Sequence, residues 1–145
     1  MSVTPEQDGH VAPRLAQQLD PASTPTSPLL EISNAMVRLY KETFGRGPTH
    51  ARARFAGPDT LVVLLQDTLT VSERRLAALG EHDRLREHRQ LLRGMLDDEM
   101  RALVERILSR ETVALINGID THHDVAAEVF VLAPPGELEP RGGAG

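Results

Sequence analysis

The amino-acid sequence predicts a single α+β domain in which four strands form one mixed or antiparallel sheet with helices packed on one face. Three observations carry this prediction. An amphipathic helical segment is followed by two adjacent β-rich segments, and a second pair of β-rich segments follows two further helical segments. Two hairpins that frame a pair of helices are typical of a sheet-and-helix sandwich. The predicted order is therefore α-β-β-α-α-β-β.

The first helix is predicted over 28–45. Ser27 is a good N-cap, and Pro28 suits the first helical position because its missing N–H is not needed there. Gly45 is typical of the residue that ends a helix. Apolar residues with helical spacing form one face, which consists of Leu29, Ile32, Met36 and Leu39.

Two strands are predicted near 50–56 and 60–67. Strict alternation in the first strand places small or apolar residues on one face and basic residues on the other, namely Ala51, Ala53 and Phe55 against His50, Arg52 and Arg54. The segment from Thr60 to Leu65 is a continuous apolar run between turn signals. Such a run predicts a central strand that is buried on both faces.

Two helices are predicted over 71–79 and 83–109. Thr70 and Glu73 have the spacing of a capping box, and Asp83 can cap the longer helix. Gly94 inside that helix costs about 1 kcal/mol relative to alanine, which predicts close packing at this position.

The last two strands are predicted over 112–119 and 125–132, with a polar turn between them. Alternation in the final strand places a set of small apolar residues on one face, namely Val125, Ala127, Val129 and Val131. We expect the folded body to cover 28–133. The Pro-rich arm 1–27 and the Pro- and Gly-rich tail 134–145 are predicted to be disordered, because they cannot bury enough apolar surface.

Composition excludes several classes of protein. The chain has no cysteine, which removes disulfide scaffolds, thiol catalysis and cysteine-bound zinc. No segment has the ~18 consecutive apolar residues of a membrane span, so direct membrane insertion is not expected. The formal net charge is −5, which disfavours nonspecific binding to DNA or RNA. The first residues lack the features of a secretory signal, and we therefore expect a cytoplasmic protein.

The densest basic region of this acidic chain follows the first helix, and it is the candidate binding site. Two glycines permit a tight turn with exposed amides, and a basic strand face comes next. Three interpretations stay open: a helix stop with a solvated strand face, a site for an anion such as phosphate, bicarbonate or a nucleotide, or a surface for an acidic partner. The candidate residues are Gly45, Arg46, Gly47, Thr49, His50, Arg52 and Arg54.

A weaker candidate, for a divalent metal, lies in the polar turn at Asp120, His122, His123 and Asp124. Imidazole and carboxylate groups are suitable ligands, but adjacent histidines in a hairpin point to opposite faces. A polar turn without metal is therefore the favoured interpretation. The acidic run from Asp97 to Glu99 is expected to be a solvated helix face. No acid–base pair or activated nucleophile is recognisable, and we expect neither a cofactor nor enzymatic activity.

Several segments resemble the MpsC-like family. The most specific is Phe44 to Arg52, with the letters FGRGPTHAR, and similar segments occur at 32–42, 69–74 and 127–132. The family is named after a component of a sodium-translocating, membrane-potential-generating system that is linked to bicarbonate or cation uptake. The resemblance covers 30–132 and implies a small accessory or regulatory protein. It points to Gly45 through Thr49 as a family site and to a membrane-transport protein as a candidate partner.

The leading hypothesis is therefore a non-enzymatic soluble accessory module that binds an anion or an acidic partner. The alternative is a KH-like module that associates with RNA or ribosomes, because type II KH and BolA-like domains have a similar order of elements. The alternative is disfavoured because the body 28–133 has no GxxG loop, carries the acidic stretch Asp97–Glu99 and has few aromatic residues. A homodimer is expected because one small domain cannot easily cover all its apolar helix faces and strand edges.

Overall fold

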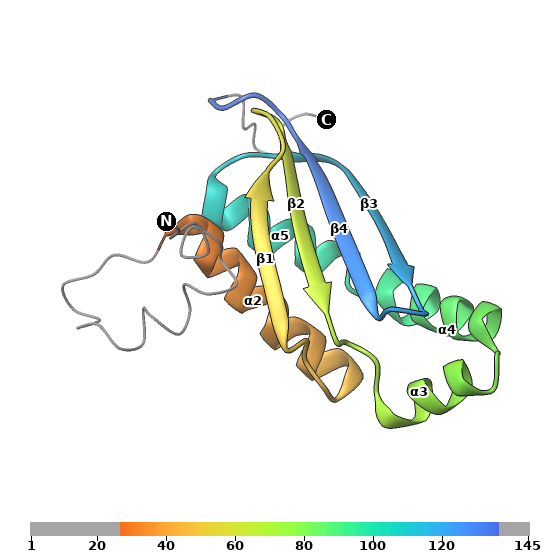
Figure 1. The fold of residues 1–145 in the computed structure, drawn as a ribbon. Helices are drawn as coiled ribbons and strands as arrows, with labels where there is room; N and C mark the ends of the chain where they lie inside the picture. Colours follow the sequence, from red (N-terminus) through yellow and green to blue (C-terminus); the bar gives the residue numbers. More distant parts are fainter. Residues whose placement is uncertain (1–26, 137–145) are drawn as a thin grey trace, which may run out of the picture.

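The structure, a computed structural model, describes residues 27–136 and confirms the α+β class and the predicted order of elements (Figure 1). The predicted disordered arm 1–27 and tail 134–145 lie outside the described residues, apart from Ser27 and 134–136. The elements are α2 (Pro28–Phe44), β1 (His50–Phe55), β2 (Thr60–Gln66), α3 (Val71–Ala78), α4 (His82–Gly94), α5 (Asp97–Leu108), β3 (Thr112–Asp120) and β4 (Val125–Leu132).

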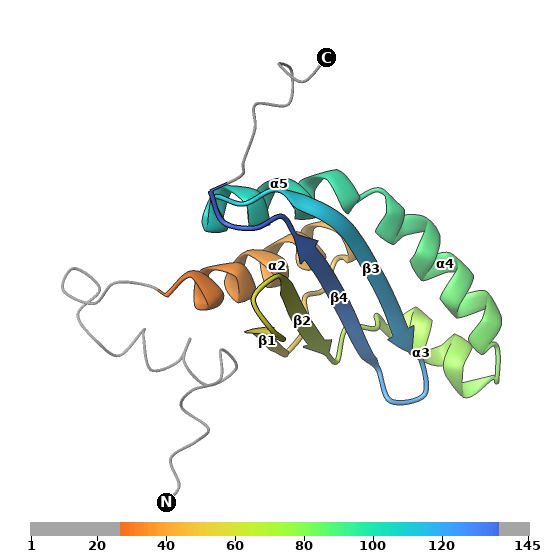
Figure 2. The same cartoon turned by 90° about the horizontal axis from the view of Figure 1, so that it is seen from above.

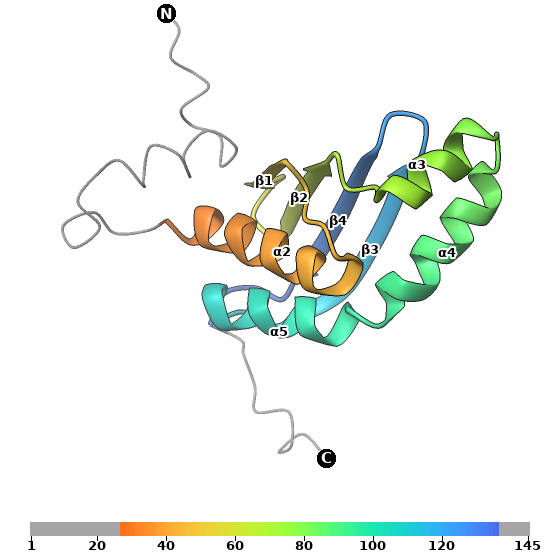
Figure 3. The same ribbon diagram turned by 90° about the horizontal axis from the view of Figure 1, so that it is seen from below.

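The four strands form one sheet in the order β1-β2-β4-β3, and every neighbouring pair is antiparallel. The sheet is therefore antiparallel rather than mixed. In its register, Arg52 lies opposite Leu64, Leu64 opposite Ala127, and Ala127 opposite Gly118. The views from above and from below show that the helices lie along one face of the sheet and leave the other face without a helix (Figures 2 and 3).

The hydrophobic core lies between the sheet and the helices. Alternate residues of β2 and β4 point into it and are almost fully buried, as Leu61, Val63 and Phe130 illustrate. Helix α2 contributes Ile32 and Met36, which are also fully buried. Burial of side chains of this size contributes about 1.5–3 kcal/mol each, which makes this layer the main source of stability.

The prediction that β2 is buried on both faces is wrong for one face. Leu61, Val63 and Leu65 are buried, whereas Val62 and Leu64 are only partly buried because no helix covers their side of the sheet. The continuous apolar run therefore reflects one core face and one apolar face that stays accessible.

The long helix predicted over 83–109 is two helices. α4 ends at Gly94, and Met95 and Leu96 form a turn before α5 begins. A straight helix of that length would extend about 40 Å, whereas the break lets both halves follow the twisted sheet. A Cβ on Gly94 would meet no atom within 4 Å, so the predicted close packing at this glycine is also wrong.

Most of the predicted helix ends are confirmed. The Ser27 hydroxyl accepts a hydrogen bond from the Leu30 amide at 3.1 Å, and both halves of the Thr70–Glu73 capping box are present. Asp83 is not the cap of α4, because this helix already begins at His82 and has no side-chain cap. Asp83 lies in the first turn and pairs with Arg86.

Candidate functional site

The glycine turn after α2 is held by Arg46, which reaches across to the connection between β2 and α3. Its guanidinium donates hydrogen bonds to the backbone carbonyl of Asp67 at 2.7 Å, to that of Leu69 at 3.1 Å, and to Asp67 Oδ2 at 2.8 Å. The hydrogen bond from Arg46 lowers the pKa of Asp67 and raises the pKa of Arg46 itself. Arg46 therefore links two loops, and its donors are directed at the protein rather than at an outside anion.

The two glycines of the turn also have structural roles. Gly45 ends α2 with a φ of 82°, a conformation that residues with a side chain rarely adopt. A Cβ on Gly47 would lie 2.9 Å from the Val37 carbonyl oxygen, so only glycine lets this loop pack against α2. Thr49 follows the turn, and its amide donates to the Gln66 carbonyl at 3.1 Å. These four predicted site residues therefore shape the entry to β1.

The remaining three predicted residues, His50, Arg52 and Arg54, share one face of β1, as the alternation predicts. Ala51 and Ala53 between them are buried against the helices. The basic residues therefore lie on the helix-free side of the sheet, at its β1 edge.

The helix-free side of the sheet is named here the uncovered face. Its residues follow from the register of the four strands and are His50, Arg52, Arg54, Thr60, Val62, Leu64, Gln66, Val125, Ala127, Val129, Val131, Ala114, Ile116, Gly118 and Asp120. Its middle is apolar along both central strands, and Ile116 on β3 is 59% exposed. The structure thus joins the basic edge of β1 to an apolar band, an association that the sequence analysis did not anticipate.

The four residues of the weaker metal candidate do not converge on one point. Asp124 accepts hydrogen bonds from the Thr68 amide at 2.8 Å and the Leu69 amide at 3.0 Å, and Asp120 accepts from the amides of His122 and His123 at 2.9 and 3.1 Å. These carboxylates therefore fix the turn. Within the described range 27–136, no group of three or more histidine, cysteine or acidic side chains could hold a metal ion.

A second feature of this turn is a pair of stacked histidines. The rings of His82 and His122 are 3.7 Å apart between centroids and nearly parallel, and His82 Nδ1 lies 2.8 Å from the Thr121 hydroxyl. The hydrogen bond from His123 lowers the pKa of Asp120. These contacts join the β3–β4 turn to the start of α4.

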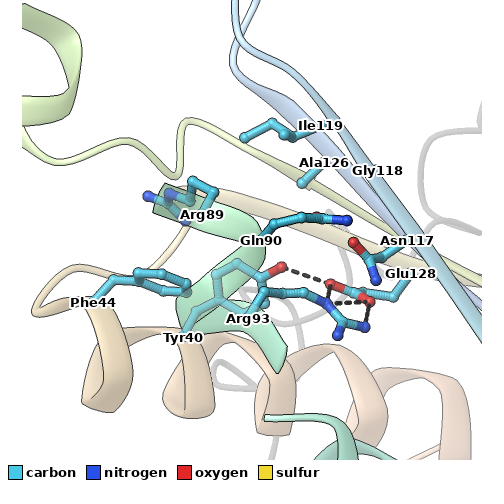
Figure 4. Close-up of a pocket in the computed structure, with 10 residues that line it drawn as sticks. All are labelled: Tyr40, Phe44, Arg89, Gln90, Arg93, Asn117, Gly118, Ile119, Ala126 and Glu128. Atoms are coloured by element: carbon cyan, nitrogen blue, oxygen red, sulfur yellow. Dashed lines mark hydrogen bonds and ion pairs between the residues drawn. The ribbon is translucent and has the colours of Figure 1, made fainter. Parts of the chain in front are cut away.

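A buried ionic network between α4 and the sheet was missed by the sequence analysis. Arg93 Nε lies 2.9 and 2.8 Å from the two carboxylate oxygens of Glu128, and the Tyr40 hydroxyl donates to Glu128 Oε2 at 2.7 Å (Figure 4). Glu128 is 1% exposed and Arg93 5%. Arg93 also pairs with Asp97, so the acidic run at the start of α5 is not wholly a solvated face.

Burial and charge act in opposite directions in this network. Burial alone would lower the pKa of Arg93, but the Glu128 carboxylate outweighs it and raises the pKa. Burial, followed by the Glu128 charge, raises the pKa of Tyr40 well above its ordinary value. Both effects keep Arg93 cationic and Tyr40 protonated, so that each can donate to Glu128.

A parallel pair lies one helical turn earlier on α4. Arg89 Nη2 donates to Glu73 Oε1 and to the Thr68 carbonyl, both at 2.6 Å, and the guanidinium lies 3.9 Å from the centre of the Phe44 ring. Burial opposes ionisation of Glu73, but hydrogen bonds from Arg89 and the Thr70 amide outweigh it and lower the pKa of Glu73. The second pair thereby binds α3 and α4 to the end of α2.

A small cavity of about 20 Å³ lies beside these pairs, with Gln90 and Asn117 among its lining residues (Figure 4). Its size suits about one water molecule. Since Glu128 and Glu73 are both bound by guanidinium groups, neither is placed to exchange a proton with a substrate. The network is a structural clamp. The sequence signal for it was a glutamate at an inward position of the last strand.

Comparison with known proteins supplies the family. A family model described as "Na+-translocating membrane potential-generating system (MpsC)" matches residues 29–134, which is well over half of the chain. The chain therefore belongs to the MpsC family, as its sequence motifs predicted. It matches no curated protein and no solved structure. None of the helices in the described part combines the length and apolar character needed to cross a bilayer.

Proposed function

We propose that this MpsC family member is a non-enzymatic accessory module of a sodium-translocating, membrane-potential-generating system. In this proposal it docks on a protein component of that system, on the cytoplasmic side, through the uncovered face of its sheet. The family description supports the link to the system. The accessible apolar face supports docking as the mode of action.

The observation that carries the proposal is the composition of the uncovered face. An antiparallel sheet with one free face usually alternates between apolar core residues and polar outward residues. In β4 the outward positions are instead apolar, and in β2 they are apolar between Thr60 and Gln66, as Val62, Leu64, Val129 and Val131 illustrate. Contiguous apolar surface of this kind is typical of protein interaction sites.

The basic edge indicates the charge of the partner. Arg52 and Arg54 lie directly beside Leu64 and Val62 in the register, so positive charge borders the apolar band along β1. Alternate side chains on a strand are about 6–7 Å apart, which suits an extended acidic surface better than one compact phosphate. We therefore favour an acidic, partly apolar protein surface over a free anion as the ligand.

The test is binding of the purified chain to inside-out membrane vesicles from cells that lack its gene. We expect saturable binding that Val129→Glu and the pair Arg52→Ala and Arg54→Ala each weaken at least tenfold. Leu91→Glu is the matched control, since Leu91 is 75% exposed on α4, away from the uncovered face. Binding to protein-free liposomes of the same lipids, or equal binding by all variants, would contradict the proposal.

The RNA-binding alternative gains no support from the site. Single-stranded RNA is commonly held by bases stacked on exposed aromatic rings. Phe130 is fully buried, and Phe55, although 42% exposed, lies on the opposite side of β1 from Arg52 and Arg54. The uncovered face, as defined by its residues above, therefore presents no aromatic stacking surface.

A further inference from the structure

A shallow groove of about 300 Å³ runs between α2 and α5, in the helical layer rather than on the uncovered face. The two helices lie side by side and run in opposite directions (Figures 1 and 3). The apolar floor of the groove is formed by Ala35, Leu39, Ala102 and Leu103. Its rim carries four exposed charged residues, namely Arg38, Glu42, Glu99 and Arg106.

The charges on this rim are separated by sign along the groove. Because the helices are antiparallel, Glu42 near the end of α2 lies toward the same end as Glu99 near the start of α5. Arg106 near the end of α5 lies toward the other end, and Arg38 precedes Glu42 by one turn in that direction. The groove therefore has an acidic end and a basic end.

The arrangement is not explained by contacts within the chain. Among the ion pairs between residues 27–136, none involves Arg38, Glu42, Glu99 or Arg106. An arginine four residues before a glutamate is also the less favourable orientation for a pair on one helix. Equal numbers of opposite charges thus border an apolar floor without neutralising each other.

We propose that this groove is the contact surface for a second copy of the chain, related by a two-fold axis across the groove. A two-fold axis brings the same patch of both copies together, so the patch must complement itself. With the axis through the middle of the groove, the acidic end of each copy meets the basic end of the other. Leu39 and Leu103 are already buried within one copy, so the exposed Ala102 supplies the apolar centre.

The dimensions of the groove predict a reversible dimer. α5, the shorter of the two helices, has 12 residues and is about 18 Å long, and two packed helices are about 20 Å wide. The face therefore offers about 350 Å² per copy, or about 700 Å² in total, which is the size of a weak, transient interface. We expect a dissociation constant of hundreds of micromolar that rises with salt. This inference does not depend on the proposed function, because the uncovered face stays free in such a dimer.

The test uses sedimentation of the full chain and of two charge-reversed variants. The all-basic variant carries Glu42→Arg and Glu99→Arg, and the all-acidic variant carries Arg38→Glu and Arg106→Glu. We expect the wild type to dimerise at hundreds of micromolar, and each variant alone to associate at least tenfold more weakly. An equal mixture of the two variants should recover wild-type association, because every contact then joins opposite charges.

The control carries Asp83→Arg and Glu87→Arg on α4, which change the net charge as much as the all-basic variant but lie outside the groove. It should dimerise like the wild type. If circular dichroism shows that a double variant is unfolded, the single variants Glu99→Arg and Arg106→Glu take its place in the mixture. A monomeric wild type at 1 mM, a dimer insensitive to these reversals, or a mixture that does not associate would each overturn the proposal.

Discussion

Glu128→Gln tests the buried clamp, because it removes the carboxylate charge while nearly preserving the shape of the side chain. Arg93 would stay buried with only Asp97, whose side chain is 43% exposed, to balance its charge. Removing one partner of a buried pair typically costs about 3–5 kcal/mol of unfolding free energy. We expect about 3 kcal/mol, since Asp97 compensates in part, which corresponds to roughly 12 °C in melting temperature for a domain of this size.

Urea denaturation followed by circular dichroism measures this loss, and two variants control it. Asp83→Asn breaks the pair with Arg86, in which the Asp83 side chain is 91% exposed, and should cost about 0–1 kcal/mol. Arg93→Met combined with Glu128→Leu removes both charges and should cost less than Glu128→Gln alone. A loss below about 1 kcal/mol for Glu128→Gln would refute the clamp.

Two further predictions concern the glycine turn. Gly47→Ala should lower the free energy of unfolding by about 1–3 kcal/mol, because the added Cβ would meet the Val37 carbonyl. Gly118→Ala is the control and should not show that loss, because its added Cβ would meet no atom within 4 Å. Equal losses for the two variants in urea denaturation would contradict the close packing at Gly47. Arg46 lowers the pKa of Asp67 in the folded protein below the ordinary value of 3.8. The pair should therefore contribute to the free energy of unfolding above pH 3.8, and this contribution should decline as the pH falls below that value. Acid titration of Asp67→Asn should show a shallower decline in that range, and an unchanged titration curve would contradict the role of the pair.

Local signals in the sequence were sufficient for most of the fold. Ser27 and Gly45 mark the ends of α2, the Thr70–Glu73 spacing marks the start of α3, and strict alternation marks β1. Each of these features depends on residues within a few positions of one another. Their interpretation therefore did not require knowledge of the tertiary structure.

Features that depend on contacts between distant residues could not be predicted in the same way. Arg46 finds its partner 21 positions later, and Arg93 meets Glu128 across 35 positions. The apolar residues of β2 gave no indication of which face the helices cover, because both faces are apolar. The break after Gly94 depends on the path that α4 and α5 take over the sheet, which the leucine spacing does not encode.

In the proposed function, the uncovered face docks on a component of a sodium-translocating, membrane-potential-generating system. The most direct measurement is the potential that a step in external sodium generates in cells whose chromosomal copy of the gene is deleted. Wild type and Leu91→Glu should restore the potential, whereas folded Val129→Glu should restore little of it. An unchanged potential in the deletion strain, or full restoration by Val129→Glu, would contradict the claim.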